Sequence, residues 1–172
     1  TKYTAKLKLR EGLHRIRLDW YENCCGARIS FYMEKIHKPS YPIDKWERLW
    51  YEYIGDGKFG KFLGKGPHQR ELNFDDDWGT DKVAHGRSDL IGFISSRTVE
   101  IREPGTYRFI VGSDDGVRLY VDGELLIDAW KDQGYTEYQA EKKLTIGPHK
   151  LRLEWYENIG AAHLSFNMEK IS

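Results

Sequence analysis

The sequence predicts an all-β protein, an antiparallel β-sandwich or barrel of the jelly-roll type. Three observations favour this class: short runs of alternating apolar side chains recur along the chain, Gly, Pro and Asp turns separate them, and no segment has the apolar rhythm of a long helix. Many short strands joined by such turns are typical of antiparallel sandwiches and barrels. With 172 residues, the chain is long enough to bury one domain with an appendage.

Charge and hydropathy exclude two kinds of partner. The chain carries 27 basic and 27 acidic residues, so it lacks the basic excess that generic nucleic-acid binding requires. No apolar run approaches the about 20 residues that cross a bilayer, and no basic-then-apolar leader opens the chain. We therefore expect neither nucleic-acid binding nor membrane insertion. Because the first residue is Thr1 rather than methionine, we expect a fragment of a longer protein or a processed product.

An internal repeat divides the chain. Residues 1–36 align with residues 136–171 without a gap, and both copies contain Trp-Tyr-Glu-Asn and Met-Glu-Lys-Ile at equivalent positions. The repeat unit is therefore a whole domain, of which the chain carries one partial copy and one complete copy. This predicts three parts: 1–36 as the C-terminal strands of a preceding repeat, 37–45 as a Pro-containing linker, and 46–172 as a complete domain.

The partial copy has two open interpretations. Ile16, Leu18 and Trp20 alternate with charged residues, so strands formed here would have one apolar face. Unpaired strands with one apolar face tend to pair with the edge of another sheet. The copy is either a slice of a tandem array, belonging to the preceding domain, or a set of strands exchanged with a neighbouring chain. In both cases it requires a partner surface.

The elements of the complete domain follow from its alternation and its turn residues. An aromatic run predicts the first strand, and a stretch with five glycines predicts a loop after it. In order, we expect a strand at 46–53, a loop at 55–66, a short strand running into an acidic turn at 71–79, a strand at 90–101, a hairpin at 106–123, a strand at 125–130, a polar loop at 131–136, and then the repeated strand pair.

The functional interpretation depends on the segment 106–123. Its two alternating runs have the adjacent carboxylates Asp114 and Asp115 between them, which predicts a hairpin. Asp122 and Gly123 have the preferred chemistry of a second, tight hairpin turn. Neighbouring carboxylates repel each other unless something positive lies between them. The pair is therefore either half of a calcium site or an Asp-Asp-Gly turn that faces solvent.

Five motifs follow one another through the complete domain. They are Gly-Thr-Tyr-Arg-Phe at 105–109, Ser-Asp-Asp-Gly-Val-Arg-Leu-Tyr-Val-Asp-Gly at 113–123, Ile-Asp-Ala-Trp at 127–130, Trp-Tyr-Glu-Asn at 155–158 and Gly-Ala-Ala at 160–162. In this order they resemble the PA14 domain, the protective-antigen-like β-sandwich module of bacterial toxins, fungal adhesins and some glycosidases. The likeness covers a complete domain over about 46–171, and residues 1–36 resemble the last third of another copy.

The resemblance implies a calcium site. In sugar-binding members of the family, two adjacent aspartates joined by a cis peptide hold the ion together with an Asn or Gln amide and nearby carbonyl groups. Carried over to this chain, the ligands would be Asp114, Asp115, the Asn158 amide and a carbonyl at about Gly160. Calcium takes about six to eight oxygen ligands, so sugar hydroxyls can fill positions that the protein leaves open.

Two aromatic side chains are candidate sugar-binding residues. Trp130 and Tyr135 follow the aspartate pair in the chain, and aromatic faces stack on the C–H side of sugar rings. Trp130 also fits a packing role, because its place in the motif looks like part of the fold. We predict both as ligand-binding residues around the 131–136 loop.

The resemblance therefore implies a non-catalytic, lectin-like module that binds carbohydrate with the help of Ca²⁺ and serves adhesion outside the cell or at its surface. Two alternatives remain. One is a structural or assembly module of a tandem-repeat surface protein or filament with strand exchange, and the other is an accessory module of a glycoside hydrolase. No nucleophile, base and orienting group can be assembled from the sequence, so we expect no enzyme activity.

Other polar clusters are weaker candidates. The three aspartates at 75–77 either coordinate a cation or form a solvated acidic turn, and the acidic turn is the simpler interpretation. His14 and His149 occupy equivalent places after a turn in the two copies, which favours a structural role.

The partial copy is not expected to bind metal by itself. Asn23 is equivalent to Asn158, but residues 1–36 contain no adjacent aspartate pair. Cys24 and Cys25 are sequence neighbours. Because a disulfide between adjacent residues is strained, we expect two reduced thiols.

Overall fold

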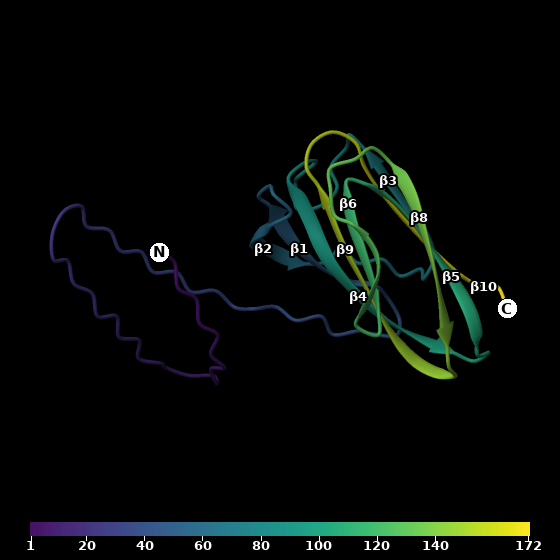
Figure 1. Cartoon of the computed structure of the whole chain (residues 1–172), viewed down its shortest axis with the longest axis horizontal. Helices are drawn as coiled ribbons and strands as arrows, with labels where there is room; N and C mark the ends of the chain where they lie inside the picture. Colours follow the sequence, from purple (N-terminus) through teal and green to yellow (C-terminus); the bar gives the residue numbers. More distant parts are fainter. The chain divides into compact units, whose positions relative to one another are not determined.

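The computed structural model describes residues 1–172 as two units, Thr1–Ile36 and His37–Ser172. The second unit contains ten strands: β1 (Glu47–Tyr53), β2 (Phe59–Lys65), β3 (Phe74–Gly79), β4 (Ile91–Ile101), β5 (Gly105–Asp114), β6 (Gly116–Val121), β7 (Glu124–Ala129), β8 (Thr136–Leu144), β9 (Gly147–Glu157) and β10 (Ala162–Lys170). They form a six-stranded sheet in the order β2-β1-β4-β9-β6-β7 and a four-stranded sheet in the order β3-β10-β5-β8. Every strand pairing is antiparallel, and the two sheets face each other (Figure 1). The predicted all-β sandwich is confirmed.

The core lies between the two sheets, because alternate side chains of each strand point to the same face. In β9 this face consists of Leu151, Leu153 and Trp155, all fully buried. Phe109 and Phe166 close the core from the four-stranded sheet, with their ring centroids 6.4 Å apart. Most of the buried apolar side chains form one contiguous cluster. No helix of the structure is long and apolar enough to cross a membrane.

The hairpin predicted across 106–123 is wrong. β5 pairs with β8 and β10, whereas β6 pairs with β7 and β9 in the other sheet. Asp114 and Asp115 therefore lie where the chain crosses from one sheet to the other. Local alternation shows which face of a run is buried, but it does not show which strand pairs with it. The turn at Asp122 and Gly123 is confirmed, with φ of 51° and 82° between β6 and β7. A type I′ turn requires positive φ at both positions.

Two further expectations for single elements are wrong. The segment 55–66, predicted as a loop, contains β2 at the edge of the six-stranded sheet, where its pairing with β1 shifts register after Trp50. An edge strand pairs on one side only, so it tolerates glycines that would weaken a central strand. The aspartates at 75–77 lie within β3, an edge strand paired with β10, rather than in an acidic turn.

Residues 37–45, predicted as a linker, are grouped with the sandwich unit His37–Ser172. The Thr98 amide donates to the Pro42 carbonyl at 2.8 Å.

Residues 1–36 contain no strand, and all of them are exposed. In the repeat alignment they correspond to β8, β9 and β10. In the sandwich these three strands pair with β3, β4, β5 and β6 and never with one another. Residues 1–36 thus contain strand sequences without the strands that would complete their sheets. Cys24 and Cys25 are exposed free thiols in this unit.

The turns of the two copies agree even though their strands do not. His14 Nε2 lies 2.7 Å from the Arg10 carbonyl oxygen, and the equivalent His149 Nε2 lies 2.8 Å from the Thr145 carbonyl oxygen. Each contact joins residues four positions apart, so it needs no distant partner. The expected structural role of these histidines corresponds to this local contact, which in the complete copy lies at the turn before β9.

Candidate cation and ligand site

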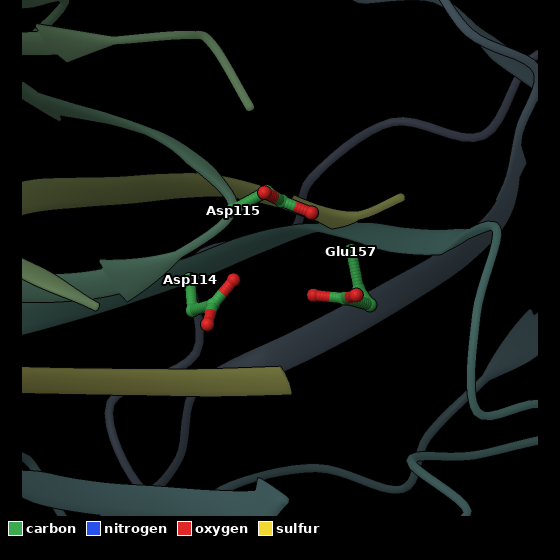
Figure 2. Close-up of side chains that lie close together, drawn as sticks. All are labelled: Asp114, Asp115 and Glu157. Atoms are coloured by element: carbon green, nitrogen blue, oxygen red, sulfur yellow. The ribbon is translucent and has the colours of Figure 1, made fainter. Parts of the chain in front are cut away.

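A cluster of three carboxylates lies at one end of the sandwich. Asp114 ends β5, Asp115 follows it, and Glu157 ends β9. One carboxylate oxygen from each residue lies within 4.8 Å of the other two. Figure 2 shows the side chains of Asp114 and Glu157 facing each other, with the Asp115 carboxylate beside them. The Asp114–Asp115 peptide is cis, which is the geometry that the family resemblance implied.

Hydrogen bonds from two loops hold Asp115 in place. Its Oδ1 accepts from the Gln133 amide at 2.8 Å, and its Oδ2 accepts from the Asn158 amide at 2.9 Å. Its carbonyl oxygen accepts from Ser113 Oγ at 2.8 Å and from Gln133 Nε2 at 3.0 Å. The 131–136 loop and the β9–β10 connection therefore both fix this corner. Such backbone donors orient a carboxylate without neutralising it.

Glu157 is the member of the cluster that the sequence analysis did not select. The alternation along β9 places it on the core-facing side with Leu153 and Trp155. The residue is 0% exposed, and neither of its carboxylate oxygens has a hydrogen-bond partner. The same alternation would have identified it, because a glutamate in the apolar register of a strand is unexpected.

The three carboxyl groups of the cluster lie close together without an ion-paired cationic side chain. None of its three members takes part in an ion pair. Burial, followed by the nearby charges of Asp115, Asp114 and Asp89, raises the pKa of Glu157 to about 8. Burial and then the charge of Asp115 raise the pKa of Asp114, while His163 lowers it. Like charges in a partly desolvated site oppose one another's ionisation, and a bound cation would reverse that effect.

The predicted ligands Asn158 and Gly160 both donate hydrogen bonds to loop carboxylates. Asn158 Nδ2 donates to Asp132 Oδ2 at 2.9 Å, so its amide bonds to a loop carboxylate while its backbone N–H holds Asp115. The Gly160 amide donates to Asp89 Oδ1 at 2.9 Å. Asp89 and Asp132 thus lie next to the predicted ligands. Sequence reasoning missed both because they lie in loops without a periodic pattern.

Tyr135 lies beside the cluster on the four-stranded sheet. Its ring stacks on His163 with centroids 4.0 Å apart, and its hydroxyl lies 2.8 Å from Ser165 Oγ. His163 is the register partner of Asp114 across β10 and β5. A Cβ atom at Gly112 would lie 2.1 Å from the Tyr135 hydroxyl, so only glycine lets the ring cover this part of β5. Tyr135 is 41% exposed and is available for contact.

A shallow groove of about 500 Å³ follows this face of the sheet. Tyr135 and Ile110 contribute apolar surface, and Asp75, Glu137 and Asn167 contribute polar groups. Small-molecule sites of this kind combine an apolar lining with a few polar groups that fix orientation. Tyr135 is among the residues that line the groove, whereas none of the three carboxylates of the cluster is.

The Trp130 side chain packs against several neighbouring groups. Its Nε1 donates to the Gly57 carbonyl at 3.0 Å, and the Arg118 guanidinium lies 4.0 Å from its ring centroid. The Tyr156 ring meets it edge-to-face at 4.8 Å. The structure thus brings Tyr135 to the site as an exposed aromatic and places Trp130 among neighbouring side chains.

The aspartates at 75–77 do not converge. Asp76 forms a largely buried ion pair with Arg48 at 2.7 Å, and Asp75 pairs with His163. Asp77 accepts a hydrogen bond from a backbone amide two residues ahead. Because adjacent residues of a strand point to opposite faces, the three carboxylates cannot share one ion.

Comparison with known proteins identifies the family of the chain. A family model described as the PA14 domain matches residues 50–171. Among curated proteins, the anti-sigma-I factor RsgI3 of Acetivibrio thermocellus is 41% identical over 92 residues, which are 53% of this chain and 14% of that protein.

Two solved structures have the same fold. An anti-sigma factor domain-containing protein is 30% identical, with a TM-score of 0.60 over 74% of this chain and 43% of that chain. The PA14 sugar-binding domain of an RTX adhesin is 17% identical, with a TM-score of 0.50 over 74% of this chain and 90% of that chain. The chain thus spans less than half the length of the anti-sigma factors that it matches.

Proposed function

Because this chain belongs to the PA14 domain family, we propose that it is a non-catalytic carbohydrate-binding module of a larger protein outside the cell or at its surface, and that Ca²⁺ assists binding. The observation that carries the proposal is the cluster of three carboxylates without an ion-paired cation at one end of the sandwich. An open groove lined by Tyr135 adds to it. Asp114 and Asp115 would hold the ion, with the Asn158 amide and the Gly160 carbonyl as further oxygen donors.

The chemistry of the cluster suits calcium. All of its candidate donors are oxygens, which are the ligands that this hard cation prefers. Two oxygens on one calcium ion are separated by at most about 5 Å, because each lies about 2.3–2.6 Å from it. The three carboxylate oxygens lie within 4.8 Å of one another and satisfy that limit. The ion would supply positive charge and open coordination positions for sugar hydroxyls.

The neighbouring groove suits a saccharide. Tyr135 offers a partly exposed ring for the C–H face of a pyranose, and Asp75, Glu137 and Asn167 offer hydrogen-bonding groups for its hydroxyls. The sugar-binding domain of the RTX adhesin has this fold, and the anti-sigma factors are candidates for the type of parent protein. A glycoside hydrolase parent would leave the chemistry of the module unchanged.

A glycan-binding assay tests the proposal. The intact chain is applied to a panel of immobilised glycans in CaCl₂ or in a chelator. We expect glycan binding that is lost with the chelator and with Asp115→Asn, and that is kept in Asp128→Asn, which changes an exposed aspartate on β7. Tyr135→Ala should weaken glycan binding and leave calcium binding unchanged. Glycan binding that survives both the chelator and Asp115→Asn contradicts the calcium-assisted mechanism.

For residues 1–36 we propose that they complete a preceding PA14 copy by pairing with its equivalents of β3, β4, β5 and β6. The pairing of β8, β9 and β10 with only those strands supports this. Exchange of residues 1–36 between chains is the alternative assembly. Sedimentation of the intact chain separates the two: we expect a monomer, whereas a dimer that disappears when residues 1–36 are removed favours exchange.

A further inference from the structure

We propose that Glu157 is itself a ligand of the cation, so that the site has three carboxylate ligands rather than an aspartate pair alone. The inference rests on the proposed function, because it assigns a further ligand to the same ion. It concerns a residue that the family resemblance did not mark.

The Glu157 side chain is buried without a partner. Glu157 is 0% exposed, yet neither of its oxygens has a hydrogen-bond partner. Burying a carboxylate without a partner is costly, and an apolar residue would fill this place in the strand without that cost. The inward register of β9 nevertheless brings Glu157 to the end of the core. A cation bound between the carboxylates would supply the missing partner.

The Glu157 side chain is also oriented toward the aspartate pair. The Glu157 carboxylate faces Asp114 and Asp115 rather than solvent (Figure 2). No lysine, arginine or histidine forms an ion pair with any of the three. Three carboxylates directed at one space, with no protein cation between them, form a set of donors that a divalent ion can join.

The side chain of the neighbouring Asn158 already has a partner of its own. The family resemblance assigns the side-chain ligand from this strand to Asn158, but the Asn158 amide nitrogen donates to Asp132. The backbone of Asn158 meanwhile holds Asp115 through its N–H group. Glu157 is thus the residue of this strand end whose side-chain oxygens face the aspartate pair without other partners.

Terbium luminescence provides the test, with Tb³⁺ as the probe in place of Ca²⁺. Trp155 Nε1 donates to the Asp114 carbonyl at 3.1 Å, so this indole lies close enough to sensitise an ion in the cluster. We expect saturable terbium emission from the intact chain that calcium displaces. Glu157→Gln should weaken the apparent affinity more than about 100-fold, which exceeds the about 10- to 100-fold typical of a group that only orients a ligand.

The controls separate this inference from the proposed function. Glu22→Gln changes the equivalent glutamate of the partial copy and should bind terbium like the unmodified chain. If Asp115→Asn loses binding while Glu157→Gln keeps it, Glu157 is not a ligand and the proposed site stands. If the unmodified chain binds neither terbium nor calcium, the proposed calcium site itself fails.

A second measurement covers the case in which Glu157→Gln does not fold. The unmodified chain is labelled with carbon-13 at the glutamate side-chain carboxyl carbons, and their resonances are followed through a calcium titration. We expect the Glu157 signal to move to a new position at saturation, while the Glu22 signal stays unchanged. A Glu157 signal that remains in place in the calcium-saturated chain overturns the inference.

Discussion

Residues 1–36 and 136–171 have closely related sequences and different structures. Trp20 is 50% exposed in a unit without strands, whereas its equivalent Trp155 is fully buried in β9. The turn contacts of His14 and His149 are nevertheless alike. The difference shows that the turns of this fold are local, while its strands depend on partners elsewhere in the chain. The second copy has those partners in β3, β4, β5 and β6.

The largest expected difference between the two copies is in tryptophan burial. Trp155→Ala should lower the free energy of unfolding by about 3–5 kcal/mol, because it removes a large side chain from the core and leaves a cavity. The matched variant Trp20→Ala should change it by less than about 0.5 kcal/mol. Urea denaturation of both variants measures the contrast. Equal losses would show that Trp20 is buried as deeply as Trp155 in solution.

The next largest effect concerns the equivalent glutamates. In a chelator and at a pH above the value of about 8 to which burial raises the pKa of Glu157, Glu157→Gln should stabilise the protein by about 1–3 kcal/mol, because it removes an unpaired buried charge. Calcium should then raise the melting temperature of the unmodified chain and not that of the variant. Glu22→Gln should behave like the unmodified chain in both conditions. Thermal melting with and without calcium provides the comparison, and destabilisation of the metal-free protein by Glu157→Gln would contradict it.

A smaller effect depends on pH through His149. Burial lowers the pKa of this histidine, but hydrogen bonds to Asp122 and to the Thr145 carbonyl outweigh burial and the nearby charge of Lys142, so the pKa is raised overall. A raised folded-state pKa gives stability that is fully present below the unfolded value of about 6.5 and is lost as pH rises through the folded value.

The unmodified chain should therefore lose stability above about pH 6.5. His149→Gln should reduce this pH dependence and leave the part that comes from Glu157, whose raised pKa also lowers stability as pH rises. His14→Gln should leave it intact, because the partial copy has no counterpart of Asp122. Urea denaturation of the three proteins at several pH values measures the effect. An identical pH dependence in the unmodified chain and His149→Gln would exclude His149 as its source.

The smallest effect is expected from removing residues 1–36. Every strand of the sandwich lies within His37–Ser172, so this unit should fold alone and melt within about 2 °C of the intact chain. Calorimetric melting of both chains tests this. A much lower melting temperature for the shortened chain would show that residues 1–36 are part of the sandwich in solution.

The sequence predicted the sandwich, most of its strands and the Asp122–Gly123 turn, because alternation and turn chemistry are local properties. It did not predict that β5 and β6 belong to different sheets, since both runs bury one face in either arrangement. β2 was missed because its glycines resemble a loop, although an edge strand tolerates them.

The candidate site could be predicted only in part. Asp114 and Asp115 stand out as adjacent carboxylates, whereas Asp132 and Asp89 reach the site through loop conformations that leave no sequence pattern. Glu157 was within reach, because the period of two along β9 places it among core residues. The family resemblance marks its neighbour Asn158 as the ligand instead.

Calcium calorimetry tests most directly the central claim that the complete copy contains a cation site and the partial copy adds none. We expect one calcium ion per intact chain, the same stoichiometry and affinity after residues 1–36 are removed, and no binding to Asp115→Asn. No heat of binding from the intact chain, or binding that disappears with residues 1–36, would contradict it.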